Sequence, residues 1–226
     1  MKDYRLLIDK YKDALEHVKQ YYEETAPKDR SAYHPWSLPQ FKMEHVLRVL
    51  RYSLMLVSRR KADLDVVALA AILHDLATYT AERKDHAVEG SKLAEKYLTE
   101  NGYQDELVKR VVRAIAVHAG PLVFEANAIE DRILQDADTI DKVSAFGITS
   151  TLLHYGSRGY LPGQALDEMK KDCPPRLKWM LETMHTKEGK RIVRQGCKYF
   201  KTSLNCLRKS FSQPERAPDL YFHKDD

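Results

Sequence analysis

The sequence predicts an all-α fold, and three observations support this prediction. Apolar residues recur at spacings of three and four along most of the chain, as on one face of an α-helix, and no segment shows the alternation typical of a strand. The nine Gly and nine Pro among 226 residues are few for a β-sandwich or barrel of this length. A composition of 43% hydrophobic and 31% charged residues is typical of amphipathic helices around a sizeable core.

The composition also limits the expected partners and location. The 37 basic and 33 acidic residues give a net charge of +4, which does not indicate nucleic acid as a partner. Cys173, Cys197 and Cys206 are odd in number and lack C-x-x-C spacing, so we expect reduced thiols. The charged pattern of residues 2–24 is not that of a signal peptide, and there is no run of about 18 apolar residues that could span a membrane. We therefore expect a cytoplasmic protein without membrane contact, and the sequence makes no prediction of its oligomeric state.

Three breaks between the expected helices are marked by residues 26–40, which contain three prolines, by Asn101-Gly102 and by Gly120-Pro121. The expected helices cover residues 2–24, 40–60, 63–75, 86–100, 105–118, 128–141 and 144–156, followed by two or three further helices up to residue 211. The segment 63–75 is apolar on nearly all sides, which is also compatible with a buried strand, but its alanines and its length favour a central buried helix.

Capping residues mark several of the expected helix ends. Asp63 and Asp85 precede helices in the N-cap position, and Asn127 with Glu130 resembles a capping box. The pair Asn101-Gly102 is a typical left-handed helix end.

These elements predict four parts of the chain. Residues 1–39 form an N-terminal helix and loop that pack on a core, and residues 40–158 form the core itself. Residues 159–211 form a C-terminal helical extension, and residues 212–226 are a polar tail with two prolines.

Side chains that can bind a metal occur on several of these helices in a defined order. They are His45, His74, Asp75, His86, His118, Asp136 and Asp138. A set of imidazoles and carboxylates suits Mn, Fe, Co, Ni or Zn better than calcium, and no cysteine lies nearby to suggest a thiolate site. A single histidine on a helix face is more often a packed or surface residue. The order of the whole set, rather than any one member, therefore indicates a metal site.

This order resembles the HD superfamily, whose name refers to a vicinal histidine and aspartate. The resemblance is carried by EHVLRVLRY (44–52), LAAILHDLA (69–77) and QDADTIDKV (135–143), and it extends over about residues 40 to 155. It implies an HD-domain helical bundle with flanking N- and C-terminal helices. It also implies that His45, His74, Asp75 and Asp138 hold a divalent transition metal ion.

Two choices within this set depend on geometry and on the family pattern. Asp136 and Asp138 are two helical steps apart, a rotation of about 200°, so both cannot face one ion. In segments of this kind in the family the second aspartate is the usual ligand, so we assign Asp138 as the ligand and Asp136 to a supporting or capping role. His86 and His118 resemble the two additional histidines of family members that bind two ions. Alternatively, they are an ordinary helix-start and an ordinary helix-end histidine.

The resemblance further implies a metal-dependent phosphohydrolase that cleaves a small phosphorylated metabolite, a nucleotide or a related phosphoester or anhydride. A divalent ion lowers the pKa of bound water towards 7, which supplies hydroxide, and it polarises a phosphoryl oxygen. In this scheme His74 and Asp75 are catalytic, and Asp75 orients the attacking water. Arg48, one turn from the first ligand histidine, is the expected phosphate contact, with Arg83 and Lys84 as further candidates. The sequence contains no nucleotide-binding glycine-rich motif, and we expect no organic cofactor.

Two alternative functions remain open at this point. A minority of HD proteins hold a mixed-valent di-iron centre that activates O₂, and they use a similar six-residue set. The second alternative is a non-catalytic metal-binding regulatory module. Hydrolysis of cyclic dinucleotides is not expected, because Leu76-Ala77-Thr78 stands where such enzymes often have Ile-Gly-Lys, and no Gly-Tyr-Pro motif is present.

Overall fold

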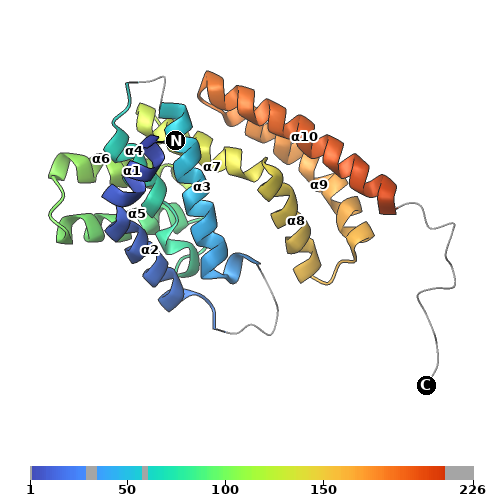
Figure 1. Cartoon of the computed structure of the whole chain (residues 1–226), viewed down its shortest axis with the longest axis horizontal. Coiled ribbons are helices and arrows are strands. Elements are labelled where there is room, and N and C mark those ends of the chain that lie inside the picture. The colour runs from blue at the N-terminus through green and yellow to red at the C-terminus, as the bar shows by residue number, and fades with distance from the viewer. Residues whose placement is uncertain (1, 29–34, 58–60, 212–226) are drawn as a thin grey trace.

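The computed structural model describes residues 2–28, 35–57 and 61–211, and within these ranges it is helical without any strand (Figure 1). The α-helices are α1 (Lys2–Lys10), α2 (Lys12–Thr25), α3 (Pro39–Val57), α4 (Leu64–Leu73), α5 (His86–Glu100), α6 (Asp105–Ala116), α7 (Ile129–Lys142), α8 (Ala145–Ser157), α9 (Pro162–Thr183) and α10 (Lys187–Phe211). Three short 3₁₀ helices are η1 (Pro35–Ser37), η2 (Leu76–Tyr79) and η3 (Gly120–Glu125). The predicted all-α fold is confirmed.

Helix α4 lies at the centre of the core. Every residue from Val66 to Leu73 is buried, and α4 packs against α2, α3, α6 and α7. Its alanines and β-branched residues let these neighbours approach from all sides, so the helix needs no solvent-facing stripe. The alternative of a buried strand is therefore excluded. Because α4 is surrounded, the residues that follow its last turn, His74 and Asp75, are delivered into the interior of the molecule.

Capping at α4 and α5 agrees only in part with the prediction. The Asp63 carboxylate accepts hydrogen bonds from the backbone N–H groups of Asp65 at 3.0 Å and Val66 at 3.4 Å, as expected of an N-cap. Asp85 occupies the same position before α5, but its side chain makes no capping hydrogen bond. Gly102, with φ of 71°, follows α5 in the predicted left-handed conformation.

The expected capping box of α7 is wrong in its residues. The N-cap position is Ala128, one residue later than predicted, and this shift moves the third helical position from Glu130 to Asp131. The Asp131 carboxylate accepts hydrogen bonds from the backbone N–H groups of Asn127 at 3.1 Å and Ala128 at 3.0 Å. Glu130 instead accepts a hydrogen bond from the backbone N–H of Asp63 at 2.9 Å, which ties the start of α7 to the start of α4.

The single N-terminal helix expected over residues 2–24 is also wrong, because the structure divides it at Tyr11. This residue has φ of −111° and ψ of 29°, outside the helical region, and separates α1 from α2. Its side chain is buried. Packing of this ring has overridden a continuous helical pattern.

The last two helices, α9 and α10, form a long antiparallel pair in which α9 packs against α8 and α10 packs against α7 (Figure 1). The joint between this pair and the core involves Asp136 of α7, whose carboxylate accepts hydrogen bonds from the backbone N–H groups of His185 at 2.9 Å and Thr186 at 2.8 Å. Asp136 thus has the geometry of the supporting role predicted for it. The predicted division at residues 39, 158 and 211 remains a prediction, and the expected polar tail, 212–226, lies outside the described residues.

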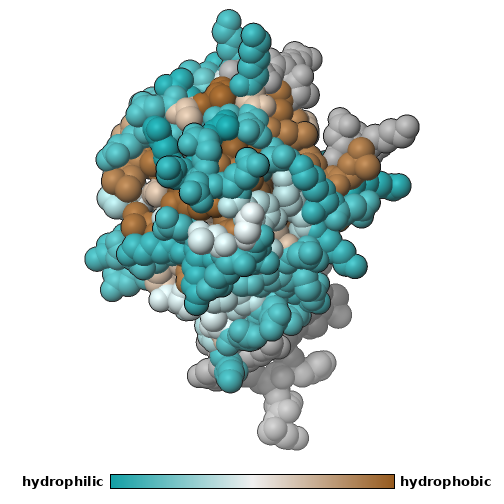
Figure 2. All heavy atoms as spheres, turned by 90° about the vertical axis from the view of Figure 1, so that its left-hand side faces the viewer, coloured by the Kyte–Doolittle hydropathy of each residue, from teal (hydrophilic) through white to brown (hydrophobic). Residues whose placement is uncertain are grey.

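The surface agrees with the amphipathic composition. On the side shown in Figure 2, hydrophilic side chains cover most of the surface and hydrophobic ones form separate patches. Among the described helices, none combines the length and the apolar composition that crossing a lipid bilayer requires.

Candidate metal centre

Five helices bring the six predicted metal ligands into one cluster. His45 is on α3, His74 and Asp75 follow α4, His86 opens α5, His118 follows α6, and Asp138 is on α7. All of them except His86 are buried, and the His86 side chain is 18% exposed. The structure therefore brings together residues that span more than ninety positions of the sequence.

One group of ligand atoms surrounds the Oδ2 atom of Asp75. This oxygen lies 3.5 Å from His45 Nε2 and 3.6 Å from His74 Nε2, and the two Nε2 atoms are 3.3 Å apart. Oδ1 of Asp138 lies 3.6 Å from His45 Nε2. Metal–ligand bonds of about 2.0–2.2 Å place neighbouring ligand atoms of one ion roughly 3.0–3.5 Å apart. His45, His74 and Asp138 could hold one ion, because their ligand atoms all lie within 4.8 Å of one another.

A second group of ligand atoms faces the other oxygen of the same carboxylate. Asp75 Oδ1 lies 3.5 Å from His86 Nε2 and 3.8 Å from His118 Nε2. Asp75 therefore presents one oxygen to each group. His74, Asp75 and His118 could hold a second ion, because their ligand atoms also lie within 4.8 Å of one another.

The hydrogen bonds of the histidines decide which ring nitrogen is available. The Nδ1–H groups of His74, His86 and His118 each donate to the carbonyl oxygen three residues earlier, at 2.9, 2.6 and 2.7 Å. In His45 the Nδ1–H donates to Asp141 Oδ2 at 2.9 Å. In the neutral form of each ring, Nε2 is therefore the acceptor. His45 Nε2 and His74 Nε2 face each other at 3.3 Å, and a cation between two such acceptors would stabilise this arrangement.

The surroundings of four members of the cluster, His74, Asp75, His118 and Asp138, lower their pKa values. Burial lowers the pKa of His74, and burial together with the neighbouring His74 lowers the pKa of His118 to about 3. Burial on its own would raise the pKa of Asp75, but Lys42 and the histidines outweigh it and hold that pKa well below its usual value. Asp138 follows the same pattern, with Lys142 as the main opposing charge. These shifts favour neutral imidazoles at His74 and His118 and ionised carboxylates at Asp75 and Asp138.

Comparison with known families agrees with this geometry. The model of the HD domain matches residues 43–142, which include all six clustered residues. Residues 43–142 of the chain therefore carry an HD domain.

Individual proteins resemble the chain in sequence or in fold. The chain is 30% identical to the uncharacterized protein YpgQ of Bacillus subtilis over 138 residues, which are 58% of this chain and 62% of YpgQ. The match thus spans less than two thirds of that relative. A crystal structure of an HD-superfamily hydrolase from Bacillus thuringiensis is 21% identical, with a TM-score of 0.66 over 92% of this chain and 99% of that one. The crystal structure of B. subtilis YpgQ in complex with ADP gives a TM-score of 0.62 at 17% identity, over 90% of this chain and 97% of that one. At these identities the two structures show the fold.

The structure places Arg48, the expected phosphate contact, beside the cluster of six candidate metal ligands, which we call the HD centre. Its Nε–H donates to Asp141 Oδ1 at 2.7 Å, and its guanidinium lies 3.4 Å from the centre of the Phe146 ring. Since the other oxygen of Asp141 holds His45, Arg48 acts on the centre through Asp141. Arg83 and Lys84 are exposed, and Lys84 pairs with Glu82 at 3.2 Å.

Sequence reasoning missed three residues of this site. Lys42 is 5% exposed, and its ammonium group pairs with Asp75 Oδ2. Lys142 pairs with Asp138 Oδ2 at 2.5 Å, and Asp141 orients His45. Each lies three or four positions from a ligand on the same helix, a spacing that puts both side chains on one face. This spacing was the available signal, but in a chain rich in charge it also describes ordinary surface residues.

Asp141→Asn is expected to lower metal affinity by about 10- to 100-fold, the usual effect of losing the partner that orients a ligand histidine. The amide keeps the shape but loses the charge that fixes the His45 tautomer and pairs with Arg48. Calorimetric titration of metal-free protein with Mn²⁺ measures this. Asp172→Asn is the matched control, because Asp172 accepts a hydrogen bond from the Tyr155 hydroxyl away from the centre.

Arg48→Ala separates the two roles of this arginine. We expect a smaller loss of metal affinity in the same direction as Asp141→Asn. Unchanged metal affinity with a raised KM for a phosphorylated substrate would instead support the direct phosphate contact.

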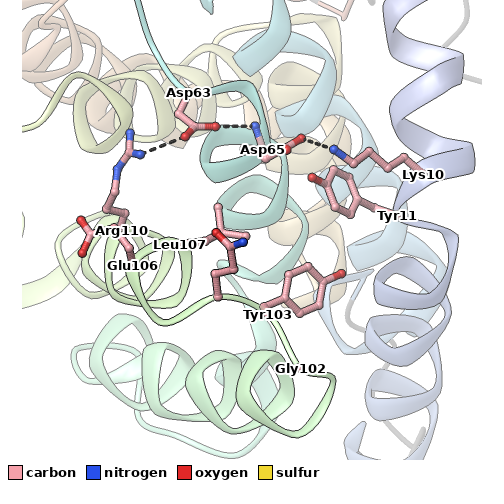
Figure 3. Close-up of a pocket in the computed structure, with 10 residues that line it drawn as sticks. Lys10, Tyr11, Asp63, Asp65, Gly102, Tyr103, Glu106, Leu107 and Arg110 are labelled. Carbon is pink, nitrogen blue, oxygen red and sulfur yellow. Dashed lines mark hydrogen bonds and ion pairs between the residues drawn. The ribbon is translucent and has the colours of Figure 1, made fainter.

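An open pocket of about 570 Å³ lies elsewhere, between α1, the start of α4 and α6 (Figure 3). Its lining residues, all within the described part of the chain, include none of the clustered histidines and aspartates. Its charges largely pair with one another, Lys10 with Asp65 at 2.6 Å and Arg110 with Asp63 at 2.9 Å. This pocket carries no comparable chemistry.

Proposed function

We propose that this HD protein is a metal-dependent phosphohydrolase that acts on a small phosphorylated metabolite, a nucleotide or a related phosphoester or anhydride. The observation that carries the proposal is the position of Asp75, whose two oxygens face two separate sets of metal-ligating atoms while a buried lysine contacts it. Such a centre supplies, with divalent ions bound, a nucleophile from water and a counter-charge for a phosphoryl group.

The residues of the chain define what the ions and the substrate meet. Asp75 is shared by both donor sets. Its Oδ2 atom accepts a hydrogen bond from the Lys42 ammonium group. His45 and His74 direct Nε2 lone pairs toward Oδ2, and His86 and His118 direct theirs toward Oδ1. Burial of the set excludes bulk water and strengthens every charge interaction within it.

Lys42 is better placed than Arg48 to bind a phosphate. A buried ammonium group next to bound divalent ions needs an anion, because Asp75 alone cannot balance the added positive charge. Lys142, which is 38% exposed and pairs with Asp138, provides a second positive charge on a more open side of the centre. An oxyanion between these lysines and the ions meets that need.

The crystal structure of YpgQ in complex with ADP supports a nucleotide as the substrate class. The phosphate chain of a nucleotide offers the anionic oxygens that two ions and two lysines would bind. We therefore place nucleotides first among the phosphorylated substrates to be tested.

The test begins with protein purified without oxygen and analysed for metal. Hydrolysis of nucleoside mono-, di- and triphosphates and of p-nitrophenyl phosphate is then measured before chelation, after chelation and after addition of Mn²⁺. We expect chelation to abolish phosphate release and Mn²⁺ to restore it. No hydrolysis by the metal-loaded protein, combined with O₂ consumption by the iron-loaded form and an organic substrate, would instead establish the oxygenase alternative.

Lys42→Met is expected to lower kcat/KM by about 100-fold, the scale of one lost charge-assisted hydrogen bond to substrate. Most of this loss should appear as a raised KM, with metal content close to that of the wild type. Lys92→Met is the control, since Lys92 is an exposed residue of α5 that pairs with Glu89. Loss of metal without a change in KM would show that Lys42 only neutralises Asp75.

A further inference from the structure

Three aromatic rings from three elements meet beside the metal centre. Trp36 comes from η1, Phe41 from α3 and Phe146 from α8. The ring centres of Phe41 and Phe146 are 4.9 Å apart, and Trp36 lies 4.7 Å from Phe41 and 6.1 Å from Phe146. The Trp36 ring centre is also 6.2 Å from that of His45. We call Trp36, Phe41 and Phe146 the aromatic cluster.

The aromatic cluster is separate from the hydrophobic core. All three rings are half-buried, and none belongs to the buried core or to the partly buried residues packed against it. Trp36 meets both phenylalanines nearly edge-on, at interplanar angles of 84° and 89°. Among the described residues, therefore, neither phenylalanine is stacked parallel on the indole faces of Trp36.

Lys42 connects the aromatic cluster to the metal centre. Its ammonium group lies 5.4 Å from the centre of the Trp36 ring and also pairs with Asp75. One side chain thus touches both an aromatic face and a carboxylate of the centre. A ligand that extends from the metal centre past Lys42 would reach this aromatic surface. A ligand that fits both ends has a phosphate at the metal centre and a flat group at the aromatic cluster.

We propose that the aromatic cluster is the subsite for the base of a nucleotide, with the phosphates directed past Lys42 toward Asp75. The inference rests on the proposed function and assigns the residues that would select nucleotides over phosphates without a base. Aromatic side chains favour nucleobases because every base has a flat face that stacks, and each such stack contributes about 10- to 100-fold in affinity. Stacking distinguishes poorly between one base and another. The subsite should therefore favour ligands that carry a base over ligands without one, whichever base it is.

Tryptophan fluorescence isolates this contact. The sequence contains two tryptophans, and the second, Trp179, is half-exposed on α9. Trp179→Phe leaves Trp36 as the sole reporter, and Trp36→Phe leaves Trp179. Stopped-flow mixing of each metal-loaded variant with ADP or with inorganic pyrophosphate follows binding before turnover. We expect ADP to quench Trp36 emission, pyrophosphate to leave it nearly unchanged, and Trp179 emission to respond to neither.

Affinity provides the second measurement. We expect ADP to bind the metal-loaded wild type about 10- to 100-fold more tightly than pyrophosphate, and Trp36→Leu to bring this ratio towards one. Phe41→Leu, at the other edge of the aromatic cluster, gives the same comparison if Trp36→Leu does not fold.

Three outcomes overturn the proposal. Equal affinities for ADP and pyrophosphate with constant Trp36 emission reject the base subsite, and the proposed function survives if phosphate release continues. A preference for ADP that persists in both leucine variants places the base elsewhere. Failure of the metal-loaded wild type to bind or hydrolyse either anion rejects both the subsite and the proposed function.

Discussion

Asp75→Asn is expected to reduce phosphate release at least about 10³-fold and to lower the bound metal from two ions per chain to one or none. The amide retains the size of the side chain, but it can offer only one oxygen, and it carries no charge to neutralise two dications. Both donor sets therefore lose their common member. Metal analysis of the purified variant and a phosphatase assay at saturating Mn²⁺ measure the two effects.

The matched control is Asp167→Asn. Asp167 is half-exposed on α9, where it pairs with Arg208 at 3.2 Å, far along the chain from the centre. The fold of Asp75→Asn should persist, as circular dichroism can show. A variant with wild-type turnover, or with two bound ions, would contradict the bridging role.

Asp136→Ala is expected to lower the free energy of unfolding by about 2–5 kcal/mol, because two backbone N–H groups lose their acceptor. These groups belong to His185 and Thr186 at the start of α10. The approach is close at this point, since a Cβ atom on Gly189 would lie 2.6 Å from Asp136 Oδ2. The absence of a side chain at Gly189 therefore lets α10 approach Asp136 this closely.

Guanidinium unfolding measures the loss, and hydrogen–deuterium exchange over residues 184–190 localises it. Asp136→Asn keeps one acceptor oxygen and should lie between the wild type and Asp136→Ala. Asp167→Ala, also at a carboxylate near the last two helices, should change stability by less than about 1 kcal/mol because its ion pair is on the surface. Equal stability of Asp136→Ala and Asp167→Ala would show that Asp136 does not hold this joint.

The central part of the fold could be predicted from the sequence because its signals are local or ordered. The apolar run of 64–73 is compatible with a buried strand as well, but its alanines and its length favour the central helix that the structure shows. The order of His45, His74, Asp75 and Asp138 is equally informative, because it resembles the ligand order of the HD superfamily.

The remaining features depend on tertiary contacts that are not visible in the periodicity of the sequence. Lys42 resembles a solvated lysine in the sequence and is buried only because α3 packs beside Asp75. Arg48 faces the same side as His45, as predicted. Its Nε–H donates to Asp141 on α7, a partner that the sequence pattern did not indicate. The break at Tyr11 and the one-residue shift at Ala128 likewise follow from packing between helices rather than from propensity.

Gln135, the neighbour of Asp136 on α7, links the last helices to the loop around the second donor set. Its Nε2 atom donates to the carbonyl oxygens of Val117 at 2.5 Å and Val123 at 2.8 Å, on either side of His118. Its Oε1 atom accepts from His185 Nε2 at 2.5 Å. The Gln135 side chain thus connects His185, which lies between α9 and α10, with the loop that carries His118.

This link has a consequence for any shortened form of the protein. The HD match ends at residue 142, yet Gln135 and Asp136 take partners from beyond residue 184. A fragment cut after the match would retain every candidate ligand and lose the groups that fix the loop carrying His118. We expect such a fragment to be an unreliable substitute for the whole chain in metal titrations, and chimaeras of HD proteins to retain their ligands best when exchanged together with the helices that follow.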